Sequence, residues 1–111
     1  MNQYFYFCLG YETDDFTIDF WTENLNLAKN EIALFEDYGF NEFQDELEKF
    51  CKEKGISNIH QDLVGLVKSG DMYDSENFTT FLSPEQLQLE ISRLEKIFGK
   101  KPSIYTGVYY C

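Results

Sequence analysis

The spacing of apolar residues at the start of the chain predicts two strands joined by a tight turn. Residues 2–9 (NQYFYFCL) are uncharged and rich in aromatic side chains, which favours a strand and suits a central position in a sheet. Residues 10–15 combine Gly, Thr and two Asp, the composition of a turn that closes a hairpin. Residues 16–21 then predict the second strand of that hairpin.

A period of two separates two faces in the second predicted strand. Phe16, Ile18 and Phe20 share one wholly apolar face, which we expect to lie against the core. The opposite face places Trp21 beside Asp19, on what we expect to be the wetter side of the sheet.

Helical spacing takes over in the next part of the chain and predicts two helices. The first has Asn24 as its N-cap and Gly39 as a left-handed C-cap. The second runs from an N-cap at Asn41 to Gly55, with acids in its first turns and lysines in its last, as the helix dipole prefers. Their apolar stripes are Leu25, Ala28, Ile32 and Phe35 in the first helix and Phe43, Leu47, Phe50 and Cys51 in the second.

The segment after these helices fits two structures. Residues 56–68 have apolar positions at helical spacing, which slightly favours a short helix. Gly65 weakens a helix, however, and the short apolar run around it also suits a strand. Residues 69–77 (SGDMYDSEN) have the composition of a polar loop.

Clear start and stop signals define the last two elements. Residues 78–82 predict a short strand, and Ser83 then opens a capping box with Pro at the first helical position. The helix that follows ends at Gly99. Residues 103–110 (SIYTGVYY) predict a closing strand, in which Gly107 suits a bulge.

The order of these elements predicts an α+β fold. Strands and helices follow one another without repeats, low-complexity tracts or an internal boundary, so we expect residues 1–111 to form a single domain. An antiparallel or mixed sheet of about four strands would pack against three to four helices. Eleven Phe, eight Tyr and one Trp supply enough bulky apolar material for one core.

The net charge of −11 lies entirely in the first half of the chain. Residues 1–48 contain twelve acids and one base, whereas residues 49–111 contain eight of each. A protein this acidic repels phosphates and anionic headgroups, which argues against nucleic acid and membrane surfaces as partners. A basic protein or a cationic ligand would be attracted to it.

The sequence favours a cytoplasmic location. Residues 1–10 contain no Lys or Arg and do not resemble a signal peptide, and no apolar run approaches the roughly 20 residues that span a bilayer. Three cysteines without CxxC spacing suit a reducing compartment.

Candidate catalytic and metal sites are weak, so we expect neither an enzyme nor a cofactor. His60 is the only histidine, which argues against zinc. It could form a nucleophilic pair with Cys8 or Cys51, but both cysteines lie in apolar segments, where a small buried hydrophobe is the ordinary interpretation. Residues 71–76 resemble a calcium loop only at first sight, because the later ligand positions of an EF-hand do not match.

Aromatic residues alternate with carboxylates between residues 11 and 48, a pattern typical of protein interfaces. In such interfaces the aromatic side chains anchor the contact and the acids steer a basic partner. The alternative is a solvated face that serves solubility alone. The residues predicted to contact a partner are Asp14, Asp15, Asp19, Trp21, Glu36, Asp37, Glu42, Asp45 and Glu46.

Small size, acidic charge, aromatic content and the lack of catalytic motifs give the whole chain a profile that resembles bacterial immunity proteins. These proteins neutralise the toxins of contact-dependent growth inhibition systems and bacteriocins. The resemblance includes no signature motif. It implies a cognate toxin, commonly a basic nuclease domain, whose active site or substrate-binding face the acidic surface would cover. Two alternatives remain open, a nucleic-acid-mimicking inhibitor of a DNA-binding enzyme and a small enzyme or ligand-binding domain.

Overall fold

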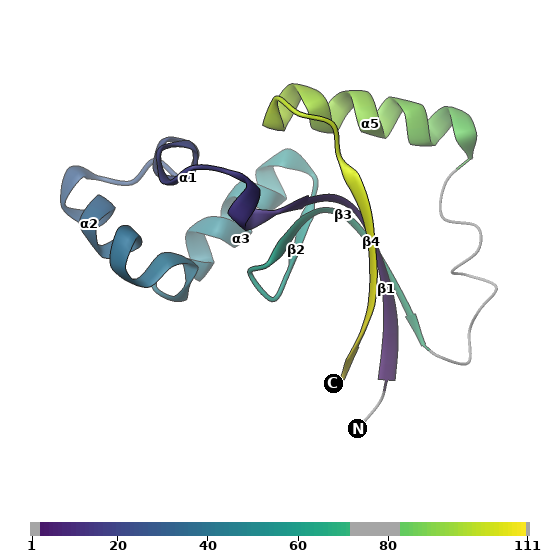
Figure 1. The fold of residues 1–111 in the computed structure, drawn as a ribbon, viewed down its shortest axis with the longest axis horizontal. Helices are drawn as coiled ribbons and strands as arrows, with labels where there is room; N and C mark the ends of the chain where they lie inside the picture. The colour runs from purple at the N-terminus through teal and green to yellow at the C-terminus, as the bar shows by residue number, and fades with distance from the viewer. Residues whose placement is uncertain (1–2, 72–82, 111) are drawn as a thin grey trace. The chain divides into compact units, whose positions relative to one another are not determined.

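The computed structural model describes residues 3–71 and 83–110 of the chain (Figure 1). In this part of the chain four strands form one antiparallel sheet in the order β2-β3-β1-β4, together with four α-helices. The predicted α+β class is confirmed. The elements are β1 (Gln3–Glu12), the 3-10 turn η1 (Thr13–Asp15), α1 (Ile18–Asn24), α2 (Lys29–Tyr38), the 3-10 turn η2 (Gly39–Asn41), α3 (Gln44–Lys54), β2 (Ser57–Ile59), β3 (Leu63–Asp71), α5 (Pro84–Phe98) and β4 (Ser103–Tyr110).

Contacts divide the chain into two compact units. The first, which we call the sheet unit, consists of residues 1–11 and 65–111. The second, which we call the acidic unit, consists of residues 12–64.

The sheet unit is built around β1, which pairs antiparallel with β4 from Gln3 opposite Tyr110 to Gly10 opposite Ser103. Its inner position, predicted from the uncharged sequence, is confirmed by the strand order. Cys8 and Leu9 point to opposite faces of β1 and are both buried, as expected for a strand covered on both sides.

The helix of the sheet unit begins where the capping box predicts. Gln86 donates its backbone N–H to Ser83 Oγ at 3.2 Å, and Ser83 returns a bond to the Gln86 side chain at 3.3 Å. At the other end of α5 the Phe98 ring lies 4.5 Å from the ring of Tyr11. The Tyr11 hydroxyl donates to the carbonyl oxygen of Lys100. These contacts fix the C-terminal end of α5 on β1.

At two positions in the sheet unit, a glycine lets another part of the chain lie close to the strand backbone. Gly65 has a φ of 155°, and a Cβ placed there would collide with the carbonyl oxygen of Leu9. At Gly107 an added Cβ would lie 2.6 Å from the ring of Tyr6, which covers this position. The bulge predicted at Gly107 is wrong, because the pairing of β1 with β4 continues through it without interruption.

The prediction of a short helix over residues 56–68 is wrong. The segment forms β2 and the start of β3, joined by a turn in which His60 and Gln61 have φ values of 49° and 67°. Leu63 and Val64 are neighbours along β3 and both are buried. A strand with both faces covered loses the alternation that distinguishes it from a helix, which explains the wrong prediction.

The hairpin predicted near the N-terminus is also wrong. β1 continues to Glu12 instead of turning at Gly10, and the 3-10 turn η1 follows it. The predicted second strand, residues 16–21, is mostly helix α1. Its N-cap is Thr17, whose Oγ1 accepts the Phe20 N–H at 3.1 Å. Phe16, which lies just before this cap in an extended conformation, stacks its ring on that of Phe20 with centroids 4.5 Å apart.

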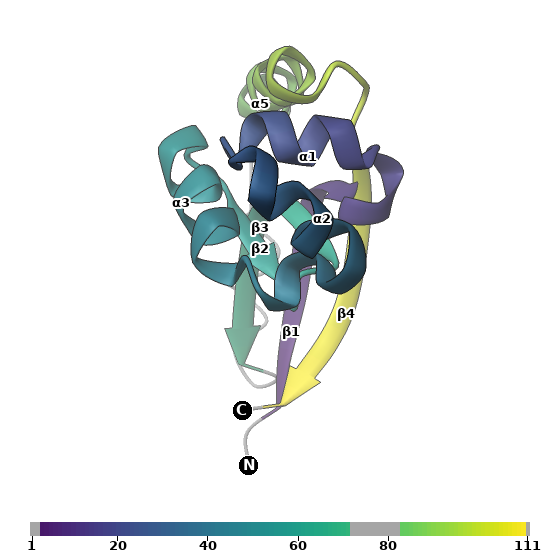
Figure 2. The same ribbon diagram turned by 90° about the vertical axis from the view of Figure 1, so that its left-hand side faces the viewer.

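The first predicted helix corresponds to α1 and α2, which Figure 2 shows together with α3. Asn24 is not an N-cap, because it ends α1 and its side-chain amide donates to the Phe20 carbonyl at 2.7 Å. α2 begins after Ala28, whose N–H donates to the Glu31 carboxylate at 2.9 Å, and it ends at Gly39 as predicted. The predicted left-handed helical conformation of Gly39 is wrong, because its φ of 59° is combined with a ψ of −143°.

The second predicted helix is confirmed as α3, with one change at its start. Its N-cap is Phe43 and not Asn41, whereas its end at Gly55 is as predicted, and Gly55 has a left-handed conformation. The predicted stripe of α3 is buried and forms part of the core of the acidic unit. Its members are Phe43, Leu47, Phe50 and Cys51.

The end of the chain and the segment after β3 were predicted with different success. The closing strand is confirmed as β4, whereas residues 69–71, predicted as loop, belong to β3. The rest of that predicted loop and the strand predicted over residues 78–82 lie outside the described residues. No helix in the described part of the chain is long and apolar enough to cross a membrane.

Candidate functional site

The acidic unit carries nearly all of the net negative charge of the molecule. Residues 12–64 contain fourteen acids and four bases, a net charge of −10, whereas the sheet unit has six acids and five bases, a net charge of −1. The segregation visible in the sequence therefore corresponds to a compact part of the structure. A cationic partner would be steered toward this unit.

The first group of predicted contact residues lies on η1 and α1. Asp14 and Asp15 are exposed in η1, and Asp19 is exposed in the first turn of α1. The turn is firmly held through Thr13, which is buried. Its N–H donates to the Asp62 carbonyl at 2.8 Å, and its hydroxyl donates to a neighbouring carbonyl of the same loop. The carboxylates therefore project from a fixed backbone.

Trp21 is in the core of the acidic unit and not at its surface. Its side chain is 2% exposed, so the prediction of a wetter face shared with Asp19 is wrong. The reason is that residues 18–24 are helical, which turns position 21 inward. Its indole Nε1–H donates to the Thr13 carbonyl at 2.9 Å. Its ring makes edge contacts with the rings of Phe16, Phe20, Phe40 and Phe50.

These contacts give Trp21 a positioning role. Its contacts join η1 and α1 to η2 and α3. Most of the predicted carboxylates lie on η1, α1 and α3. A partner would not touch this side chain, but the geometry of the surface depends on it.

The second group of predicted residues lies around the end of α2. Glu36 and Asp37 are exposed in its last turn, and Glu42 is exposed just after η2. Phe35, between these acids and the core, is buried against Phe40 at a centroid distance of 5.2 Å. This packing holds the end of α2 on the turn that follows it.

α2 also exposes two apolar residues that the sequence analysis did not select. Tyr38 is 56% exposed and Leu34 is 40% exposed, and they lie one helical turn apart. Both lie outside the buried stripe predicted for this helix. Their absence from that stripe was the signal in the sequence that could have identified them as exposed. An exposed Tyr next to Glu36 and Asp37 has the composition of an interface anchor with a charged rim.

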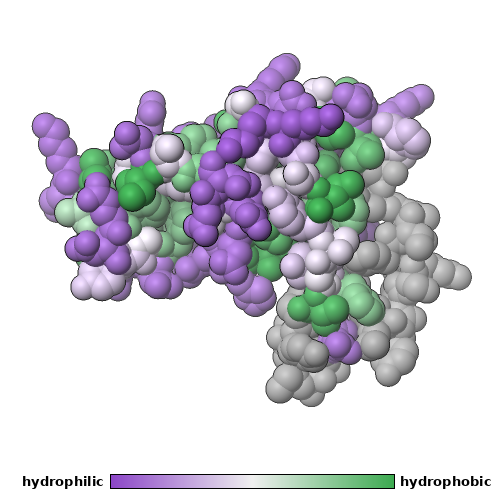
Figure 3. Space-filling view, in the orientation of Figure 1, coloured by the Kyte–Doolittle hydropathy of each residue, from purple (hydrophilic) through white to green (hydrophobic). Residues whose placement is uncertain are grey.

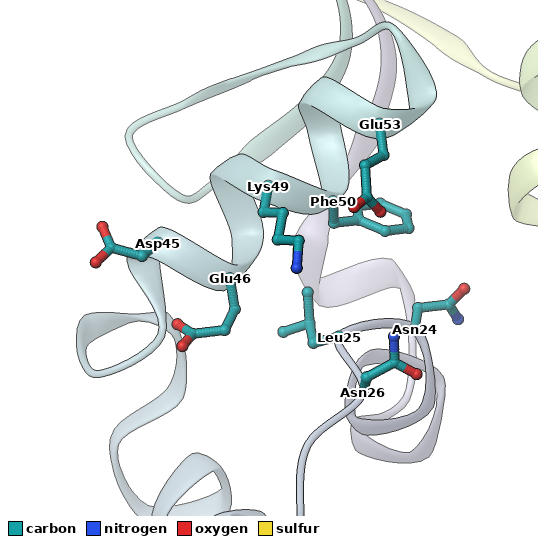
Figure 4. Close-up of a pocket in the computed structure, with 8 residues that line it drawn as sticks. All are labelled: Asn24, Leu25, Asn26, Asp45, Glu46, Lys49, Phe50 and Glu53. Carbon is teal, nitrogen blue, oxygen red and sulfur yellow. The ribbon is translucent and has the colours of Figure 1, made fainter.

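The third group borders a pocket of about 310 Å³ within the acidic unit (Figure 4). Leu25 and Phe50 supply its apolar part and are themselves buried. Of the predicted residues only Asp45 and Glu46 line it. The complete lining is Asn24, Leu25, Asn26, Asp45, Glu46, Lys49, Phe50 and Glu53.

Most of this pocket was not predictable from the sequence. The pocket joins the end of α1 to one side of α3, two segments about twenty residues apart. Figure 4 shows the Lys49 ammonium extending from α3 toward Leu25 and Asn26, with the carboxylate of Asp45 directed away from it. The carboxylates of Glu46 and Glu53 lie on either side of Lys49 along α3, three and four residues from it.

Most of the predicted carboxylates are not neutralised by neighbours. Seven of them form no ion pair with any residue between 3 and 70 or between 83 and 108, and they are therefore available to an outside cation. These seven are Asp14, Asp19, Glu36, Asp37, Glu42, Asp45 and Glu46.

The two described cysteines are inert under ordinary conditions. Cys8 and Cys51 are buried and unpaired, and burial raises the pKa of each thiol to about 12. For Cys51 the charge of Glu48 contributes to this rise in pKa. The thiols stay protonated near neutral pH, which leaves no activated nucleophile at either position. Within the described ranges no three His, Cys, Asp or Glu side chains are grouped to hold a metal ion.

Comparison with protein-family models, curated proteins and solved structures found no match to this chain.

Proposed function

We propose that this protein is a bacterial immunity protein that binds and neutralises a cognate toxin, a basic nuclease domain, through its acidic unit. The observation that carries the proposal is the concentration of a net charge of −10 in residues 12–64, with seven candidate carboxylates unpaired in the described structure. The protein itself acts without catalysis.

The chemistry of a nuclease explains why such a surface would inhibit it. A nuclease presents Lys and Arg side chains to the phosphates of its substrate, and carboxylates on a fixed scaffold can occupy the same positions. Opposite charges also accelerate encounter, toward about 10⁸–10⁹ M⁻¹s⁻¹ at low salt. The core around Trp21 reduces the entropy lost on binding, because it already holds the backbone that carries the carboxylates of η1 and α1.

Affinity that survives salt needs desolvated contacts as well as charge. Tyr38 and Leu34 offer an apolar contact on α2. The pocket offers a second one, where the stem of a Lys or Arg side chain would pack on Leu25 and Phe50 and its cationic head would meet Glu46 and Glu53. A partner that uses both would release bound water from apolar surface while it pairs the acids.

The proposal is tested by capture of the partner from the native host. A tagged protein would be incubated with host lysate and washed at low salt and then at about 1 M salt, where exposed charge pairs are screened. We expect a single basic protein to remain at high salt, and its nuclease activity on plasmid DNA to stop when the two proteins are mixed in equal amounts.

Other outcomes would overturn the proposal. Several DNA-binding proteins that are all lost at high salt would indicate a nucleic-acid mimic. A retained partner whose nuclease activity is unchanged by equimolar protein would exclude inhibition.

A further inference from the structure

β4 forms one edge of the sheet and belongs entirely to the sheet unit. Among the strands that the structure describes, β1 is its sole neighbour. The second edge strand, β2, has three residues, whereas β4 has eight. An edge strand of this length leaves a row of backbone N–H and C=O groups without a partner in the sheet.

Proteins usually protect such an edge with a charged residue, a proline or a bulge, and β4 has none of these. Ser103–Tyr110 contains no charged residue and no proline, in a chain of which 26% is charged. Its pairing with β1 passes through Gly107 without a bulge. The sequence of β4 is as apolar as that of the inner strand β1, although β4 lies at the edge.

The side chains of β4 add to this open edge. Ile104 is 57% exposed and Val108 is 41% exposed, and they lie on the same face of the strand with Thr106 between them. Figure 3 shows hydrophobic residues at the surface over β4. β4 therefore combines an edge position in the described sheet with β-branched side chains, which favour strand pairing.

We propose that β4 pairs antiparallel with β4 of a second copy of this chain, so that the two sheets join across a two-fold axis. The distribution of charge favours a second copy over the cationic partner of the acidic unit. β4 has no carboxylate to pair with a cation, and the sheet unit has a net charge of only −1. The paired strands themselves would therefore bring no like charges together.

The strand is self-complementary in one register. With Thr106 on the two-fold axis, Ile104 lies opposite Val108 of the second copy, and the pairing uses nearly the whole of β4. Opposite residues then share a face, so a β-branched pair forms on each side of a Thr–Thr pair. A shift by one residue would instead pair residues from opposite faces of the two sheets.

The first experiment measures self-association by sedimentation equilibrium up to about millimolar concentration. We expect a weak dimer, because one added strand buries less than the roughly 1,200 Å² of a standard interface. Val108→Lys places a charge opposite Ile104 twice in each dimer and should raise the dissociation constant by about tenfold or more. Leu89→Lys makes the same change at a position on α5 that is 71% exposed, and it should leave the dimer unchanged.

The second experiment tests the register by oxidative cross-linking in a Cys111→Ser background. Thr106→Cys should form a disulfide-linked dimer, because residues directly opposite in an antiparallel pair have Cα atoms about 4.5–5.5 Å apart, within disulfide reach. Leu89→Cys, equally accessible, should remain monomeric. A protein that is monomeric at every concentration, or that cross-links equally through both positions, would overturn the proposal. Neither result depends on whether the acidic unit binds a toxin.

Discussion

Trp21 shows how a single buried residue can determine a charged surface. Its indole N–H holds the carbonyl of Thr13, and its ring contacts α3 through Phe50. Trp21→Ala should lower the free energy of unfolding by about 3–5 kcal/mol through the cavity that it leaves. Trp21→Phe keeps an aromatic ring and removes the indole hydrogen bond to the Thr13 carbonyl, which still accepts the Phe16 N–H at 3.4 Å, at a cost of about 0.5–1.5 kcal/mol. Urea unfolding followed by far-ultraviolet circular dichroism measures both losses. A Trp21→Phe variant as stable as wild type would mean that the hydrogen bond contributes nothing, and equal losses in the two variants would mean that the ring contributes nothing beyond that bond.

The structural role of Gly65 was not evident from the sequence. It weakened a predicted helix, whereas in the structure it lets β3 pass close to the backbone of β1 at Leu9 and Gly10. Gly65→Ala should cost about 3 kcal/mol, since its Cβ meets backbone atoms that cannot rotate away. Gly99→Ala is the control for backbone strain without a close contact, because Gly99 has a φ of 75° and nothing lies within 4 Å of its added Cβ, and it should cost about 1–2 kcal/mol. If Gly65→Ala unfolded at the same urea concentration as Gly99→Ala, the close approach would carry no energetic weight.

The elements with several independent signals were predictable from the sequence. α5 has a capping box, Pro at its first position and a glycine stop, and α3 has an apolar stripe and a favourable charge gradient. All six positions of residues 16–21 satisfy a strand pattern. The same segment also places Phe16 and Phe20 four positions apart in the sequence, a spacing that suits a helix. Tertiary contacts of Trp21 decide between the two, and the local sequence does not contain them. The same holds for the pocket, whose two sides meet only in the folded chain.

The cap of α1 gives a prediction at the scale of one element. Thr17→Ala removes the acceptor of the Phe20 N–H and should destabilise the protein by about 1 kcal/mol. Thr17→Ser keeps a hydroxyl and should stay close to wild type. Thermal unfolding of the three proteins measures the difference. An alanine variant as stable as the serine variant would show that packing around Trp21 holds α1 without its cap.

At the scale of the whole molecule, two surfaces of different character follow from the uneven charge. The acidic unit has most of the carboxylates and the pocket, and the sheet unit has a nearly neutral edge strand. The sequence predicted the charge segregation and eight of the nine surface positions as exposed or half-buried acids, with Trp21 the exception. It could not show that β4 lies at an edge, because strand order depends on pairings between distant segments.

The most direct measurement of the central claim is the affinity of the captured basic protein for matched charge-reversal variants. Asp45→Lys/Glu46→Lys changes the pocket rim of the acidic unit, and Glu85→Lys/Glu95→Lys makes the same charge change on α5 of the sheet unit. In isothermal titration calorimetry at high salt, the first variant should lose about 2–5 kcal/mol of binding free energy, roughly thirtyfold or more in affinity. The second should stay within about threefold of wild type. Equal losses in both variants, or none in either, would contradict binding through the acidic unit.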